Sequence, residues 1–103
     1  MHQNIINAGL QLIPIHTELH PYDYVDAVID IIEKSGLKFE VGPFNTSVEG
    51  TYRQVTSLVD EINEFLVEQK CHEWILNVQY QLRSGESVTA SEKTEKFRVP
   101  AGE

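Results

Sequence analysis

Small or polar residues, most of them uncharged, recur at every second position in three segments of the chain. The members of this set are Asn7, Gly9, Gln11, Ser47, Glu49, Asn77 and Gln79. A spacing of two places side chains on one face of a β-strand. A solvent-facing sheet would carry more Lys, Glu and Arg, whereas amides and small residues suit a face whose hydrogen bonds are taken up by a ligand or a partner sheet. We therefore expect a polar sheet face that binds a small molecule, joins subunits, or does both.

Other groupings of reactive side chains are weaker indications of chemistry. His16 and His20 have a spacing that binds zinc on a helix, but Pro21 follows them and the segment is typical of a loop, so we expect no metal site. Cys71 precedes His72, which raises the alternative of a reactive thiolate–imidazole pair. Adjacent side chains on an extended chain point in opposite directions, so we expect a small buried or loop cysteine instead. The loop after the first predicted strand contains neither arginine nor glycine. A phosphate-cradling catalytic site is therefore not expected, and we predict that the protein is not an enzyme.

Composition limits the domain number and the kinds of partner. The chain has 103 residues, of which 41% are hydrophobic and 23% charged, so residues 1–103 are expected to form a single globular domain. Acidic residues outnumber basic ones 16 to 8, and the formal net charge of −8 argues against nucleic acid and anionic membranes as partners. The single cysteine allows no internal disulfide. Together with the lack of a long apolar stretch and of a signal-peptide pattern, this favours the cytoplasm.

Four strands are predicted from alternating apolar residues and turn signals. The first covers Ile5–Ile15, and Pro14 is expected to end it because proline cannot donate to a β-ladder. Lys38–Gly42 and Thr46–Glu49 are expected to form a hairpin around a Gly-Pro-Phe-Asn turn. The fourth strand covers Glu73–Leu82, where apolar and polar residues alternate again.

Two helices are predicted between these strands. The first covers Tyr22–Ser35 and is followed by Gly36, which suits the left-handed position after a helix. The second covers Tyr52–Lys70, and Thr51 with Gln54 fits a capping box at its start. Both segments carry apolar residues at helical spacing.

The order of these elements is β-α-β-β-α-β, which is the ferredoxin-like arrangement. This α+β fold has a four-stranded antiparallel sheet with both helices on one face. The apolar strand faces, which include Trp74, are expected to pack under the helices. The charged tail Thr89–Arg98 is compatible with a short helix or strand that packs on a neighbouring subunit.

The segment around the predicted hairpin resembles a known family signature. Ser35–Gly50 reads SGLKFEVGPFNTSVEG, which is similar at almost every position to the core motif of the thiamine-binding protein family, also called the MTH1187/YkoF-like family. One departure is Asn45, where glycine is common in the family, and asparagine tolerates the same left-handed backbone. The resemblance implies a ferredoxin-like fold, assembly as a dimer of dimers, and binding of thiamine or its hydroxymethylpyrimidine part without an established catalytic activity or a cofactor.

The resemblance and the chemistry of thiamine together select candidate ligand-binding residues. They are Asn7, Gln11, Phe44, Thr46, Ser47, Glu49, Asn77 and Gln79. Glu49 can accept from, or share a proton with, the pyrimidine edge, the amides can hydrogen-bond to it, and Phe44 can stack on it. The negative net charge would attract the thiazolium cation. Because no Gly-rich phosphate loop or basic cluster is present, free thiamine fits better than thiamine diphosphate.

Several of these assignments have structural alternatives. Glu49 would also suit the N-terminus of the second predicted helix, where the helix dipole stabilises a negative charge. Thr46 shares the strand parity of Val48, so it is expected to face the core unless the register slips at the turn. The amides would equally suit a contact between subunits. The competing interpretation of the whole chain is therefore a structural or regulatory homo-oligomeric module that binds no thiamine.

Overall fold

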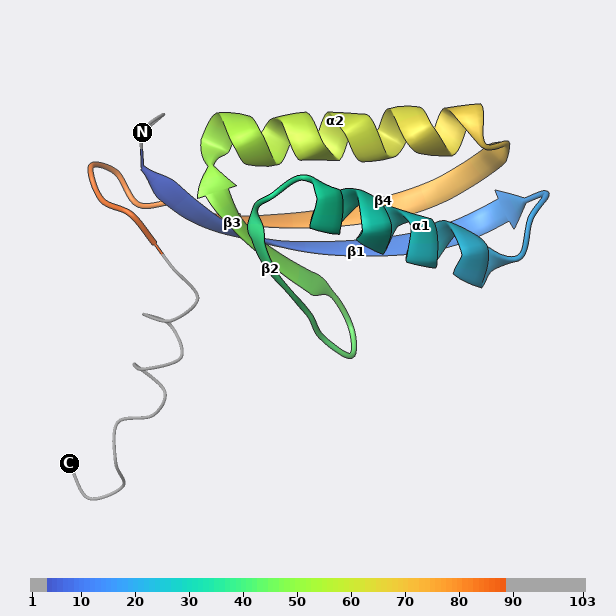
Figure 1. Cartoon of the computed structure of the whole chain (residues 1–103), viewed down its shortest axis with the longest axis horizontal. Coiled ribbons are helices and arrows are strands. Elements are labelled where there is room, and N and C mark those ends of the chain that lie inside the picture. The colour runs from blue at the N-terminus through green and yellow to red at the C-terminus, as the bar shows by residue number, and fades with distance from the viewer. Residues whose placement is uncertain (1–3, 89–103) are drawn as a thin grey trace, which may run out of the picture.

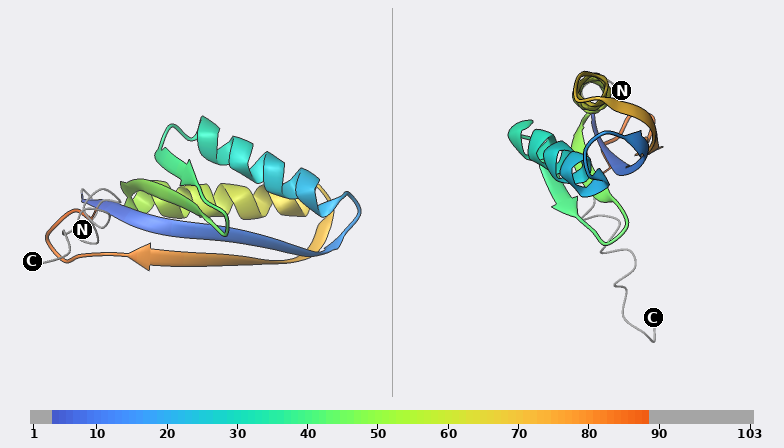
Figure 2. Two further views of the ribbon diagram at one scale, coloured as in Figure 1. Left: turned by 90° about the horizontal axis from the view of Figure 1, so that it is seen from below. Right: turned by 90° about the vertical axis from the view of Figure 1, so that its right-hand side faces the viewer.

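The strands form one antiparallel sheet, and both helices cover the same face of it (Figure 1). The structure is a computed structural model and describes residues 4–88. Its elements are β1 (Ile5–Thr17), α1 (Pro21–Lys34), β2 (Lys38–Val41), β3 (Thr46–Thr51), α2 (Tyr52–Glu68) and β4 (Cys71–Gln81). The strand order is β2-β3-β1-β4. The predicted ferredoxin-like α+β fold is confirmed, and Figure 2 shows the opposite face of β1 and β4 uncovered by helices.

Local capping residues set the starts of both helices. At α1 the Nδ1 atom of His20 accepts a hydrogen bond from the backbone N–H of Tyr22 at 3.1 Å. At α2 the Thr51 hydroxyl accepts from the Gln54 N–H at 3.2 Å, while the Gln54 side chain accepts from the Thr51 N–H at 2.9 Å. The predicted capping box is therefore confirmed. Gly36 follows α1 with a φ of +80°, as its sequence position predicted.

The core lies between the helices and one face of the sheet. Its buried side chains are Ile6, Ala8, Leu10, Tyr24, Val28, Ile32, Val48, Val55, Leu58, Ile62, Leu66 and Cys71. Trp74 packs against this cluster, and its indole N–H donates to Asn63 Oδ1 at 3.0 Å. The predicted core side of β4 is therefore confirmed. Tyr24 is buried, and its hydroxyl donates to the backbone carbonyl of Gln69 at 2.8 Å.

The prediction that Pro14 ends the first strand is wrong. β1 continues to Thr17, with an irregular register between Pro14 and His16. The reason is the uneven length of the neighbouring strands. β3 pairs with β1 only as far as Leu10, whereas β4 pairs with β1 to its end. The second half of β1 has a neighbour on one side only, and such an edge tolerates a residue that lacks an N–H.

The remaining boundaries differ from the predicted ones by a few residues. α1 begins one residue early, at Pro21, and β4 begins at Cys71 rather than Glu73. β3 extends to Thr51, so the chain passes from strand to helix without a loop. Neither helix within residues 4–88 is long and apolar enough to cross a membrane. The predicted element in Thr89–Arg98 lies outside the described residues.

Candidate functional site

The open face of the sheet carries its polar residues in rows across the strands. In one row Asn7 of β1 lies between Glu49 of β3 and Gln81 of β4. In the next row Gly9 lies between Ser47 and Gln79, and beyond it Gln11 pairs with Asn77. Six of the eight predicted site residues therefore share this face: Asn7, Gln11, Ser47, Glu49, Asn77 and Gln79.

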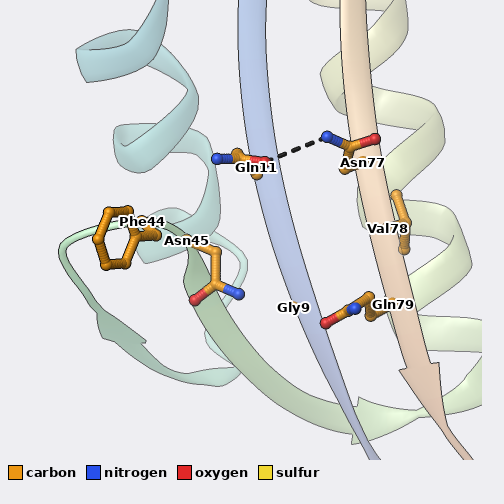
Figure 3. A pocket seen from close by; sticks show the side chains of 7 residues that line it. All are labelled: Gly9, Gln11, Phe44, Asn45, Asn77, Val78 and Gln79. Carbon is orange, nitrogen blue, oxygen red and sulfur yellow. Dashed lines mark hydrogen bonds between the residues drawn. The ribbon is translucent and has the colours of Figure 1, made fainter.

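Two adjoining hollows lie along this face, and we call them together the sheet groove. One hollow, of about 360 Å³, is lined by residues that include Gln11, Phe44 and Asn77 (Figure 3). The other, of about 390 Å³, includes Asn7, Ser47 and Gln81. Both are also lined by Gly9, Asn45 and Gln79, so the two hollows adjoin each other. Each volume lies within the range of small-molecule sites.

The floor of the sheet groove depends on Gly9. A Cβ atom at this position would lie 3.0 Å from Asn45 Nδ2 and 3.9 Å from Gln79 Oε1. Asn45 can therefore lie this close to the strand because the position has no side chain. Asn45 reaches over Gly9 from the turn between β2 and β3 (Figure 3). Asn45 does not use the left-handed backbone that asparagine tolerates, because Lys70 is the one non-glycine residue with positive φ among residues 4–88.

The amides at the two ends of the groove differ in their hydrogen bonding. At one end Asn77 Nδ2 donates to Gln11 Oε1 at 3.1 Å (Figure 3). At the other end the side-chain oxygens of Asn7 and Gln81 are buried, and neither has a hydrogen-bond partner within the described part of the chain. Asn7 is 8% exposed. At one end two amide side chains are thus hydrogen-bonded to each other, and at the other end two buried amide oxygens accept no hydrogen bond.

Phe44 forms an apolar wall at the end of the groove. It lies in the turn between β2 and β3 and is 82% exposed. It does not belong to the buried core cluster. An exposed aromatic face beside a polar groove suits stacking on a flat ring.

Glu49 lies beside the groove but lines neither hollow. Its side chain is 11% exposed, and its Oε2 atom lies 4.0 Å from Lys38 Nζ on β2. The alternative that Glu49 belongs to a helix N-terminus is wrong, because it lies within β3 and Thr51 is the N-cap of α2. The register brings Glu49 next to Asn7, at the end of the groove with the unused acceptors.

Thr46 is the candidate that the structure separates from the others. It is buried on the helix side of the sheet, as its shared parity with Val48 predicted. There it lines a different hollow of about 170 Å³, with apolar residues of α1 such as Val28. The register slip that would have turned it toward the groove does not occur.

Sequence reasoning missed Asn45 and Gln81 as groove residues. Gln81 continues the alternation of Asn77 and Gln79, so strand parity alone would have found it. Asn45 precedes β3 in a turn, where no periodicity predicts the direction of a side chain. Its position over Gly9 depends on how the hairpin folds against β1.

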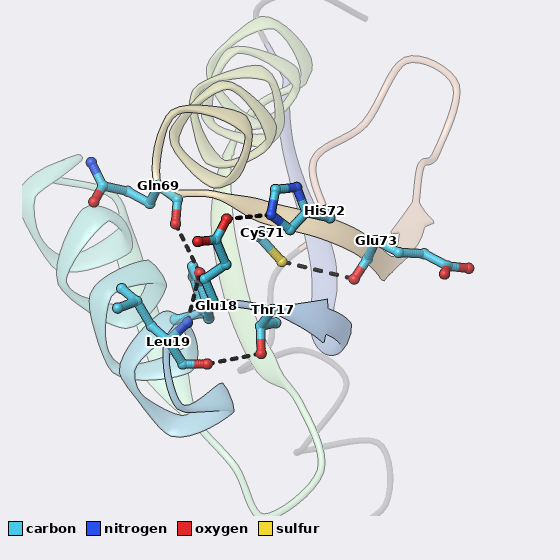
Figure 4. Close-up of polar contacts among 8 residues, drawn as sticks. Thr17, Glu18, Leu19, Gln69, Cys71, His72 and Glu73 are labelled. Carbon is cyan, nitrogen blue, oxygen red and sulfur yellow. Dashed lines mark hydrogen bonds and ion pairs between the residues drawn. The ribbon is translucent and has the colours of Figure 1, made fainter.

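A second polar cluster lies at the far end of β1 (Figure 4). His72 Nε2 and Glu18 Oε2 are 2.5 Å apart, and the His16 ring lies 5.3 Å from the His72 ring. The hydrogen bond with His72 lowers the pKa of Glu18. Within residues 4–88 no three His, Cys, Asp or Glu side chains are placed to hold a metal ion. Cys71 is buried nearby, which raises the pKa of its thiol.

The fold and the groove define a class: ferredoxin-like α+β domains with a polar cavity on the open sheet face. Comparison with known proteins gives the family within that class. The profile of the thiamine-binding protein family matches residues 8–98, and the chain belongs to this family. The resemblance seen in Ser35–Gly50 is therefore confirmed.

The relatives and solved structures agree with this assignment. A UPF0045 protein of Clostridium perfringens is 36% identical over 92 residues, which cover 89% of this chain and 96% of the relative. A domain of unknown function from Bacillus cereus superposes with a TM-score of 0.84 at 25% identity and covers 93% of this chain and 92% of that chain. A Thermotoga maritima protein whose name connects it with thiamine biosynthesis or salvage superposes with a TM-score of 0.80 at 26% identity. The match covers 91% of this chain and 99% of that one.

Proposed function

We propose that this protein binds thiamine or its hydroxymethylpyrimidine part in the sheet groove and catalyses no reaction. The observation that supports the proposal is the pair of hollows on the open sheet face, both of which are lined by Gly9, Asn45 and Gln79. A flat heteroaromatic ring needs a shallow cavity, hydrogen-bonding groups at its edge and an apolar surface on one side. The groove offers these features, and membership of the thiamine-binding family supports the choice of ring.

The charge of the protein favours free thiamine over its diphosphate. None of the residues that line the two hollows is Lys or Arg, and the net charge of the chain is −8. A diphosphate group would enter this acidic surrounding without a cationic partner, which is unfavourable. The thiazolium cation, by contrast, is attracted to a negative protein.

The proposal includes a homo-oligomer in the cytoplasm. Beyond the amide row, Ile13 of β1 pairs with Ile75 of β4 on the open face, and the two are 39% and 46% exposed. Exposed apolar side chains beside a polar groove suit a contact between sheets of two copies. A dimer of dimers would bury these faces and enclose the ligand. The lone thiol of Cys71 suits a reducing compartment.

Isothermal titration calorimetry tests this function. The ligands are thiamine, hydroxymethylpyrimidine and thiamine diphosphate, and light scattering gives the mass of the same sample. We expect saturable heat with thiamine and hydroxymethylpyrimidine, and weaker binding of the diphosphate. If a folded oligomer gives no saturable heat with either of the first two ligands at millimolar concentration, the proposed function is wrong.

The paired Ile13 and Ile75 also favour a second candidate function, a homo-oligomeric interaction module without a thiamine ligand. In that case the amides would only bridge subunits. Gln79→Lys would then reduce the particle mass, because it places a charge within the contact, while Glu49→Ala would change no ligand response. A monomeric mass for the wild-type protein would contradict this candidate.

A further inference from the structure

The end of the sheet groove near Asn7 contains two acceptors that the protein leaves unused. Asn7 lies on the central strand β1, and Gln81 is its direct partner on β4. Their oxygens Oδ1 and Oε1 are both buried, and neither receives a hydrogen bond from any residue between 4 and 88. Both residues line the same hollow of about 390 Å³.

Such a pair is costly to a protein that contains no ligand. A buried carbonyl oxygen that lacks a donor destabilises the folded state by about 1–3 kcal/mol. Replacement by an apolar side chain of the same shape would remove this cost. Buried polar groups without partners are rare in folded proteins, and each one needs an explanation, of which a donor from a bound molecule is one.

The geometry points to a donor with two N–H groups on one atom. Asn7 and Gln81 lie opposite each other on neighbouring antiparallel strands, where paired side chains are about 5 Å apart at Cβ. A primary amino group presents two hydrogens in a plane and can donate one to each oxygen. Gln81 is partly exposed, so its side chain has room to turn toward a molecule in the groove.

We propose that Asn7 and Gln81 bind the exocyclic amino group of the ligand and thereby select aminopyrimidines over oxopyrimidines. This inference rests on the proposed function. In oxythiamine, an oxo group replaces the amino group, so a third acceptor faces the two amide oxygens. The remaining ring N–H donor lies one ring position away. A site with paired acceptors therefore rejects the oxo compound through unpaired and repelling groups.

The test compares thiamine with oxythiamine by calorimetry on the wild-type protein and two variants. Asn7→Leu and Gln81→Met each replace an acceptor by an apolar side chain of similar size. Gln69→Met is the matched control, because Gln69 is an exposed amide that lines neither hollow of the sheet groove; Figure 4 shows it among the second polar cluster. Thermal unfolding and light scattering are measured on every sample.

For the wild type and the control, we expect thiamine to bind at least about tenfold more tightly than oxythiamine, which corresponds to the loss of one hydrogen bond to a buried acceptor. In Asn7→Leu and Gln81→Met, the ratio of the oxythiamine Kd to the thiamine Kd is expected to fall toward one. We expect no loss of thermal stability in either variant.

Four results would overturn the proposal. Equal binding of both compounds by the wild type, or an unchanged ratio in both variants, refutes the role of the acceptors and leaves thiamine binding intact. A lower particle mass for the variants would assign the acceptors to the subunit contact instead. If the wild type binds neither compound, the proposed function fails, and the inference fails with it.

Discussion

The floor of the sheet groove gives a prediction in which stability and binding change in opposite directions. Gly9 is a glycine in the middle of a central strand, where it lowers stability relative to alanine by about 0.5–1 kcal/mol. Its function in our proposal is to leave space. Gly9→Ala and Gly9→Leu fill that space by one carbon and by four carbons.

The structure sets the size of each effect. An alanine Cβ would lie 3.0 Å from Asn45 Nδ2, the end of a flexible side chain that can shift by a few tenths of an ångström. Gly9→Ala should therefore raise the free energy of unfolding by up to about 1 kcal/mol, and weaken thiamine binding by about two- to fivefold. A leucine side chain would enter the place where the two hollows meet, because both are lined by Gly9. We expect Gly9→Leu to weaken binding by more than about tenfold, or 1.4 kcal/mol.

Calorimetry with thiamine measures the affinities, and urea unfolding measures the stabilities. The control is Ser57→Leu, which adds a large side chain to a separate hollow of about 400 Å³ beside α2. This control should bind thiamine like the wild type. If Gly9→Leu is folded and also binds like the wild type, the ligand does not occupy the groove, and our assignment of the site is wrong.

Three further substitutions or reactions test other parts of the structure. Phe44→Ala should weaken thiamine binding in calorimetry. It should change the free energy of unfolding by less than about 0.5 kcal/mol, because the ring is 82% exposed. A loss of stability without a loss of affinity would contradict the role of Phe44 as a wall of the groove. Tyr24→Phe should lower the free energy of unfolding in urea by about 1–2 kcal/mol, since it leaves the Gln69 carbonyl without its donor, and an unchanged midpoint would show that water replaces that bond. Burial raises the pKa of Cys71, so less thiolate is present near pH 8, and its reaction with an aromatic disulfide reagent should be slower than that of a free cysteine and still increase above pH 9. A rate equal to that of free cysteine would contradict the buried position.

The local elements of the fold were predictable because their signals lie in neighbouring residues. The capping box of Thr51 and Gln54 needs only two residues three positions apart, and Gly36 needs only its own missing Cβ. The end of β1 was not predictable in this way. Pro14 is tolerated because β3 stops pairing at Leu10, and the length of a neighbouring strand is not encoded next to Pro14.

The candidate site also has features that follow from neighbouring residues and features that depend on the register between strands. Alternation alone placed Asn7, Gln11, Asn77 and Gln79 on one face, because successive side chains of a strand point to opposite sides. It also placed Thr46 toward the core, where the structure has it. Alternation does not say which residue of another strand will be a neighbour, since that depends on register.

The sequence by itself determined the order of the elements, the two faces of each strand and the polar character of the open face, because these follow from spacing along the chain. The tertiary structure decided which of these residues form a cavity. The hairpin brings Asn45 over Gly9, and the pairing of β1 with β4 brings the unused oxygens of Asn7 and Gln81 together. These contacts join segments far apart in sequence, and their geometry is set by the packing and register of the whole sheet.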